Sequence, residues 1–239
     1  MKHLVLCLFL MLSLACSVCS FTEGGEKKKT FYDASIKVDF NNVPLDSQQF
    51  YFPLIGKKDS MTPSNLLIPG GEVRKEIVEF YVDPSRIDSF CNAWFSQHLF
   101  RMKEPLLFNK SLDSDIIRVT WLRSFHNPIV ITLEKKKGQY TLHWKRCDGM
   151  GGYDPGTLVE DSGKIVDRDV WDELNRKQQE ANFWKEEYRI EPFGCDGAEC
   201  IVEAAGPDYY WVKRKRGITP VGRYMLSLAD VKVSKGDIY

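Results

Sequence analysis

Residues 116–146 read IIRVTWLRSFHNPIVITLEKKKGQYTLHWKR, and this stretch decides the fold class of the chain. It contains three runs that are rich in β-branched and aromatic residues, at 116–122, 128–134 and 139–146. Short polar connections separate the runs, and the second connection is a lysine-rich turn that ends in Gly138. Such runs, joined by a few turn residues, are typical of consecutive antiparallel strands. We therefore expect a three-stranded meander.

Helices and further strands are expected on both sides of this meander. Asp83 and Pro84 are typical of a helix start, and apolar residues then recur at helical spacing. The expected buried face of this helix consists of Ile87, Phe90, Cys91, Trp94, His98 and Leu99. Other helices are expected at 169–183 and 220–231, strands at 31–40, 72–82, 199–204 and 209–215, and a loop at 147–163.

The chain shows no internal repeat and no linker that would divide it. Residues 31–239 are therefore predicted to form a single α+β domain, with an antiparallel β-sheet of hairpins and a meander packed with two or three helices. The chain has 33 basic and 33 acidic residues, so nothing in its charge points to nucleic acid.

The N-terminus has the pattern of a secretory signal over residues 1–20. Lys2 and His3 precede an apolar run at 4–15, which is too short for a helix that spans a bilayer. Two processing routes are open, because Ser13-Leu14-Ala15-Cys16 resembles a bacterial lipobox, whereas Val18-Cys19-Ser20 suits ordinary cleavage. In the first route Cys16 carries a lipid, and residues 21–30 form a polar tether. Both routes predict an exported protein, which touches a membrane only through that lipid.

Four cysteines lie in the predicted domain, and export permits disulfides between them. Cys195 and Cys200 bracket the turn residues Asp196 and Gly197, so we predict a disulfide between Cys195 and Cys200. The remaining pair would be Cys91 with Cys147. The cysteines are not followed by paired histidines, so a zinc site is not favoured, and the sequence predicts neither a metal nor a cofactor.

The glycine-rich loop 147–156 is the most distinctive constellation. Residues 145–156 read KRCDGMGGYDPG. Exposed amides in such a loop could bind an anion while Asp148 or Asp154 acts as a base. Tight turns alone also explain glycine, aspartate and proline together, and this structural interpretation is the favoured one.

His126 is the best candidate for a catalytic histidine. It lies in the connection between two predicted strands, where functional residues often occur, whereas His98 and His143 fit ordinary helix and strand positions. A small periplasmic hydrolase would combine His126 with Asp148 and Asp154. No nucleophile motif accompanies them, so the sequence leaves it open whether the chain is an enzyme.

A second candidate surface is the hairpin strand in which Tyr209, Tyr210 and Trp211 precede the basic run 213–216. Aromatic and cationic side chains together could bind a protein or a lipid, or could simply end an edge strand. The candidate binding residues are Arg123, Tyr153, Tyr210 and Lys213.

Several motifs stand in a fixed order along residues 115–216: RVTW with Ser124-Phe125, then DGMGGYDPG, then Asp196-Gly197 with Glu203. This series resembles uncharacterised exported bacterial proteins that have no assigned activity. The resemblance implies an exported protein of the bacterial periplasm or envelope membrane. Together with the lack of a catalytic motif, it favours a non-enzymatic binding or interaction module with an envelope protein partner.

Overall fold

The structure is a computed structural model that describes residues 36–53, 79–82, 89–110, 112–180, 183, 197–207 and 209–239. The predicted signal peptide 1–20 with Cys16 and the predicted tether 21–30 lie outside these residues. So do Cys195 and parts of the strands predicted at 31–40 and 72–82. Within the predicted strand 31–40, Val38 makes only an isolated bridge to Pro44.

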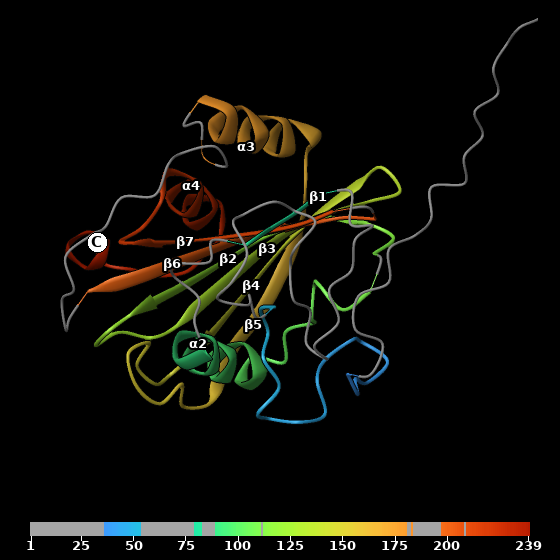
Figure 1. Cartoon of the computed structure of the whole chain (residues 1–239). Coiled ribbons are helices and arrows are strands. Elements are labelled where there is room, and N and C mark those ends of the chain that lie inside the picture. Colours follow the sequence, from blue (N-terminus) through green and yellow to red (C-terminus); the bar gives the residue numbers. More distant parts are fainter. Residues whose placement is uncertain are drawn as a thin grey trace, which may run out of the picture.

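A seven-stranded sheet forms the centre of the molecule, in the order β1-β7-β6-β2-β3-β4-β5 (Figure 1). Neighbouring strands are antiparallel, except that β1 pairs with β7 in parallel. The strands are β1 (Glu79–Val82), β2 (Asp115–Arg123), β3 (Ile129–Lys136), β4 (Gln139–Cys147), β5 (Leu158–Val166), β6 (Ala198–Ala205) and β7 (Tyr209–Arg216).

The helices cover both faces of this sheet. Helix α2 (Ser89–Arg101) lies on one face, whereas α3 (Arg168–Glu180) and α4 (Pro220–Leu228) lie on the other (Figure 1). A short 3-10 helix, η2 (Lys235–Asp237), follows near the C-terminus. This arrangement confirms the predicted α+β class and its antiparallel meander.

Strand β5 corrects the prediction of a loop at 147–163. Its central residues Asp161, Ser162 and Gly163 are turn formers, and five of its nine residues are exposed while the other four are only partly buried. Without a continuous apolar side, the local sequence has no strand signal. The strand forms nevertheless because β4 offers it a free backbone edge, and its pairing shifts register between Arg146 and Cys147.

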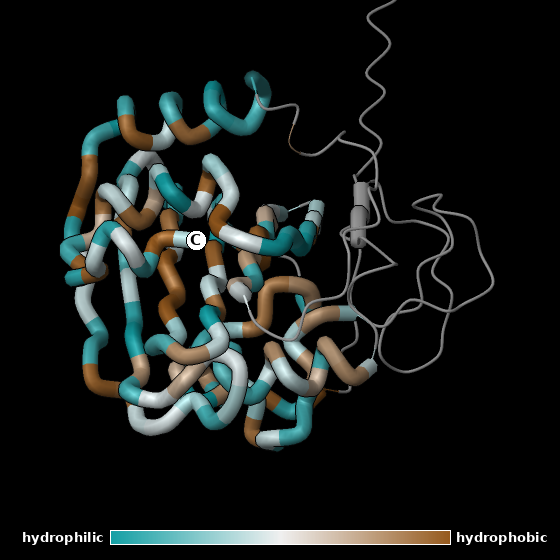
Figure 2. Tube along the Cα trace, turned by 90° about the vertical axis from the view of Figure 1, so that its left-hand side faces the viewer, coloured by the Kyte–Doolittle hydropathy of each residue, from teal (hydrophilic) through white to brown (hydrophobic). Residues whose placement is uncertain are grey.

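Alternation along the strands divides the core into two layers. On the α2 side, Ile116, Leu122 and Ile201 pack with Phe95 and Leu99 of the helix. On the other side, the sheet contributes three of the six tryptophans, and α3 and α4 close over them. This second layer includes Trp121, Trp144, Trp171, Leu174, Trp211 and Met225. The side of α3 that faces away from the sheet is mainly hydrophilic, whereas the side that faces the sheet carries the apolar residues, as Figure 2 shows at the top of the molecule.

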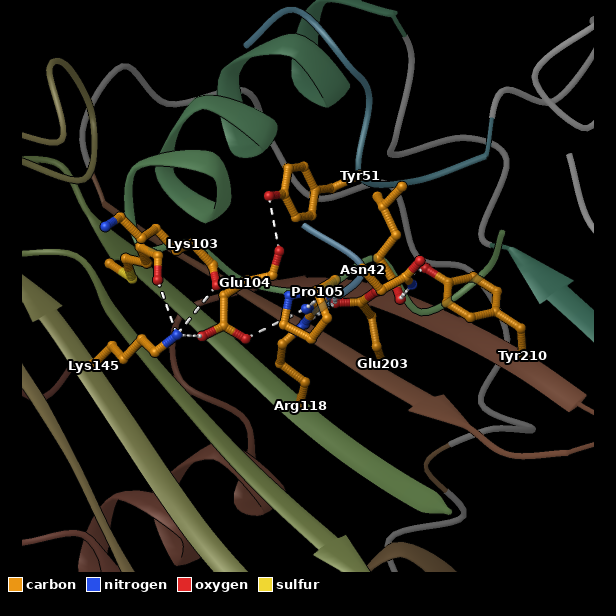
Figure 3. A network of polar contacts seen from close by, with 11 residues as sticks. Asn42, Tyr51, Lys103, Glu104, Pro105, Arg118, Lys145, Glu203 and Tyr210 are labelled. Carbon is orange, nitrogen blue, oxygen red and sulfur yellow. Dashed lines mark hydrogen bonds and ion pairs between the residues drawn. The ribbon is translucent and has the colours of Figure 1, made fainter. Parts of the chain in front are cut away.

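A buried network of polar contacts interrupts the apolar layer on the α2 side (Figure 3). Two guanidinium nitrogens of Arg118 lie 2.6 Å from Oε2 of Glu203, and Arg118 Nη1 donates to the carbonyl of Pro105 at 2.7 Å. Tyr210 donates its hydroxyl to Glu203 Oε1 at 2.8 Å. Burial acts to lower the pKa of Arg118, but the carboxylates of Glu203 and Glu104 raise it above the ordinary range, so the side chain stays charged.

The network also holds the segments that surround α2. Glu104 follows the helix and pairs with Arg118 and, at 3.1 Å, with Lys145 of β4. The Tyr51 hydroxyl donates to the carbonyl of Glu104 at 2.9 Å, and Asn42 Nδ2 donates to the carbonyl of Leu106 at 2.6 Å. Residues 36–53 are therefore fixed against the chain that leaves α2.

Replacing Glu203 by leucine should destabilise the protein strongly, because it leaves the Arg118 guanidinium buried without its main carboxylate. We expect the free energy of unfolding to fall by about 3–5 kcal/mol. The double variant Arg118→Met/Glu203→Leu removes both charges and should lose clearly less. Urea unfolding of the two variants and the wild type measures both values, and equal losses would contradict the role given to this ion pair.

Candidate functional site

The amides of the glycine-rich loop are used for hydrogen bonds within the protein. Six successive amides, from Asp148 to Tyr153, each donate to a backbone carbonyl at 2.8–3.2 Å. Their acceptors, in order, are the carbonyls of Thr157, Pro155, Asp154, His126, Ser124 and Met150. Because these donors are occupied, the loop does not present them as the anion cradle that the sequence left open.

The glycines are needed because backbone segments approach each other closely. A Cβ atom on Gly149 would stand 2.2 Å from the carbonyl oxygen of Asp154, and one on Gly151 would stand 2.6 Å from the amide nitrogen of Arg123. Real Cβ atoms do not occur at such distances from backbone atoms. The loop therefore packs its backbone directly on the connection between β2 and β3, in line with the structural interpretation of its sequence.

The three catalytic candidates are not brought together. Asp148 Oδ1 accepts from the amide of Thr157 at 2.6 Å, and Asp154 Oδ1 accepts from the amide of Gly156 at 2.7 Å. His126 faces the C-terminal segment instead, with Nδ1 at 3.0 Å from the Tyr239 hydroxyl and Nε2 at 3.3 Å from Asp237 Oδ1. Within the described ranges, no hydrogen bond or ion pair joins His126 to either aspartate.

Two of the four predicted binding residues lie in the core, which corrects the prediction of an aromatic and basic surface on β7. Tyr210 is fully buried, and Lys213 is buried and donates its ammonium to the carbonyl of Phe183. Strand β1 pairs along β7, so β7 is not the edge strand that local sequence suggested.

The other two predicted binding residues differ in accessibility. Arg123 is buried over the ring of Trp121, and its guanidinium donates to the carbonyls of Asn127 and Asp237. Tyr153 is exposed at the surface of the glycine-rich loop. Of the four, Tyr153 is the one that can reach a partner.

The cysteines differ from the predicted pairing. Cys147 and Cys200 are thiols in the structure, so Cys147 is not joined to Cys91. The Cys91 sulfur instead accepts from Arg214 Nη1 at 3.2 Å. Cys200 Sγ lies 3.3 Å from Thr219 Oγ1 at the start of α4, and burial raises the pKa of this thiol. Because Cys200 is a thiol, the predicted disulfide between Cys195 and Cys200 is not formed in the structure, although Cys195 itself lies outside the described residues.

A groove with a volume of about 650 Å³ opens between α2, the glycine-rich loop and residues 47–48. Aromatic side chains stand at its rim, where Phe90 is 76% exposed and Tyr153 is 57% exposed. Polar groups line the rest. The lining residues include Gln48, Phe90, Trp94, Gln97, Tyr153 and Asp154.

The two main walls of this groove are fastened to each other. Trp94 Nε1 of α2 donates to the carbonyl of Gly151 at 3.0 Å, and Gln97 Nε2 donates to the carbonyl of Tyr153 at 3.1 Å. The Phe125 ring, itself half exposed, lies 6.1 Å from the Tyr153 ring and extends the aromatic rim. The groove is therefore formed before any ligand arrives.

Sequence reasoning missed most of this groove. Phe90 and Trp94 were expected on the buried face of the helix, but Phe90 is largely exposed and Trp94 is only partly buried. The signal was present in the pattern, because the apolar residues of this helix cover a wider arc than one packed face needs. Such an excess of apolar surface often marks a binding site.

His98 of α2 is fully buried where the helix packs against the glycine-rich loop. Burial lowers the pKa of His98 from about 6.5 to about 4, although the nearby Gly151 carbonyl and the Asp154 carboxylate act in the opposite direction. The imidazole is therefore neutral in the folded protein at neutral pH.

Comparisons with known proteins add no assignment to this site, since no family model matches the chain and no curated protein is significantly similar to it. In the part of the chain that the structure describes, no group of three histidine, cysteine or acidic residues could hold a metal ion. Over the same residues, no helix has the length and apolar character needed to cross a membrane.

Replacing Gly149 by alanine should displace the glycine-rich loop, because the added methyl group would overlap backbone atoms of Asp154 and Pro155. We expect the free energy of unfolding to fall by about 1–3 kcal/mol. Gly236 provides the matched control, since a Cβ there meets no atom within 4 Å. Thermal unfolding of both variants tests the difference, and equal stability would show that the loop tolerates a side chain.

His98 should make stability depend on pH. Because its folded-state pKa lies below the ordinary value near 6.5, the unfolded chain takes up the proton first as the pH falls. This contribution is complete above pH 6.5 and is lost as the pH falls toward 4. Between pH 6.5 and about 5, the wild type should lose about 1–2 kcal/mol more than His98→Leu does. Parallel losses in urea titrations of the two proteins would refute this expectation.

Proposed function

We propose that the protein is an exported binding module, lipid-anchored through Cys16 or free in the periplasm, and that the groove beside α2 binds an envelope protein partner. The observation that carries this proposal is the preformed aromatic rim, in which Phe90 and Tyr153 remain exposed on rigid elements. Large aromatic side chains that already hold their positions bind with little loss of conformational entropy.

The chemistry of the groove fits a peptide segment that carries apolar side chains. The rings of Phe90, Trp94 and Tyr153 offer apolar surface, while the side chains of Gln48 and Asp154 offer polar groups for a main chain. Pockets that combine a mostly apolar lining with a few convergent polar groups are the usual sites of specific binding.

The hydrolase alternative receives no support from the geometry. His126 contacts the C-terminal segment, whereas the carboxylates of Asp148 and Asp154 accept hydrogen bonds from backbone amides in turns of the glycine-rich loop. Ser124, the nearest hydroxyl in sequence, exchanges hydrogen bonds with Gly197. Each candidate group thus has a structural role, and a reaction would need these groups to converge on one site.

Binding at the groove can be tested with the double variant Phe90→Ser/Tyr153→Ser. Both side chains are mostly exposed, so the fold should be retained while the aromatic rim is lost. A photo-crosslinking residue at position 93, where an exposed alanine lines the groove, should capture one defined envelope protein from intact cells. With the double variant, we expect the yield of this adduct to fall about tenfold or more, because a few large aromatic side chains often contribute most of the binding free energy of an interface.

Phe40 supplies the matched control, since it is 93% exposed but does not line the groove. Phe40→Ser should leave the yield of the adduct unchanged. An unchanged yield with the double variant, or the absence of any defined adduct, would overturn the proposed site.

A further inference from the structure

Strand β5 forms one end of the sheet in the described part of the chain, and its sequence has a chemical symmetry. It reads LVEDSGKIV from Leu158 to Val166, with Ser162 at its centre. Two residues before Ser162 stands Glu160, and two residues after it stands Lys164. One step farther out on each side stand the apolar residues Val159 and Ile165. The acidic and the basic residue are therefore placed symmetrically about Ser162, and so are the two apolar residues.

This symmetry has a direct structural consequence for two copies of the strand. A twofold axis at Ser162 would set two β5 strands antiparallel, with each Ser162 opposite its own copy. Glu160 of one copy would then lie opposite Lys164 of the other, and Val159 opposite Ile165. We propose that β5 pairs in this register with β5 of a second copy of the chain, so that the two sheets join into one.

Exposed apolar side chains support the pairing. Ile165 is 70% exposed and Val159 is 49% exposed, although both stand on an outer strand. Natural edge strands usually avoid such residues because they invite association with another chain. Opposed apolar pairs of this kind stabilise antiparallel strands, and the twofold axis produces the pair twice.

The charges on β5 also fit a second copy. Charged residues normally protect an edge strand because like charges meet when two such edges approach. Here the antiparallel register brings opposite charges together. Within one copy, Glu160 pairs with Arg146 at 3.0 Å and Lys164 pairs with Asp230 at 3.4 Å, and all four side chains keep some exposure. A second copy would add a further opposite charge beside each pair.

The backbone of β5 is regular where the pairing would be centred. Residues from Glu160 to Val166 pair with β4 without a shift, and the register shift lies at one end of the strand. A single strand pair buries little surface, so the dimer should be weak and should depend on concentration. This inference does not rest on the groove, because the two surfaces are formed by different elements.

Sedimentation equilibrium of the purified protein over a wide range of concentrations tests the dimer. Ile165→Lys should weaken association about tenfold or more, because the change occurs twice in a symmetric interface. Leu45→Lys is the matched control, since Leu45 is 64% exposed but belongs to no strand of the sheet, and it should dimerise like the wild type. Circular dichroism verifies that both variants are folded.

A cysteine at position 162 tests the register. Directly opposed residues of antiparallel strands have Cα atoms about 4.5–5.5 Å apart, so Ser162→Cys should form an intermolecular disulfide on mild oxidation. Asp161 would lie diagonally from its own copy, at about 7–8 Å, so Asp161→Cys should form this disulfide poorly. A monomer at all concentrations, dimerisation unaffected by Ile165→Lys, or equal crosslinking at both positions would each overturn the proposal.

Discussion

A buried guanidinium in the central strand determines how the segments around it are arranged. Arg118 is fully buried on a sheet face that packs mainly apolar side chains, and an unpaired charge there would strongly destabilise the fold. Carboxylates therefore converge on it from two directions, Glu203 from the adjacent strand and Glu104 from the segment that follows α2. A buried charge needs these specific partners, whereas apolar side chains can pack in several ways. The network therefore fixes the position of the segment after α2 more precisely than apolar packing alone would.

The position of α2 follows from this network, and the groove follows from α2. The helix ends at Arg101, three residues before Glu104, while its outer side meets the glycine-rich loop through Trp94 and Gln97. That loop in turn rests on the connection between β2 and β3, where its glycines allow backbone to lie on backbone. The exposed rings at the rim are thus held by two fixed segments: Phe90 lies on the helix α2, and Tyr153 lies on the glycine-rich loop, which has no regular secondary structure.

The regular elements could be predicted because their signals are local. Alternation and helical spacing indicate β2, β3, β4, β6 and the three helices, but β5 is stabilised by the neighbouring strand and not by its own sequence. The sequence pattern of β7 predicted Tyr210 and Lys213 at the surface. It could not show that β1, at residues 79–82 and far away in sequence, pairs along their strand. Of the residues that line the groove, only Tyr153 and Asp154 were candidate site residues by sequence, because the groove forms where three distant segments meet and no local pattern indicates such a meeting.

The order of strands has a consequence for how the chain can fold. β2, at the centre of the sheet, pairs with β6, about 80 residues later, and β1 pairs with β7, more than a hundred residues later. The meander from β2 to β5 can form early from near neighbours, but the edge of β2 stays unpaired until β6, in the last fifth of the chain, has been synthesised. High contact order of this kind slows folding. A sheet whose central strand pairs with strands so late in the sequence cannot be completed until nearly the whole chain has been synthesised.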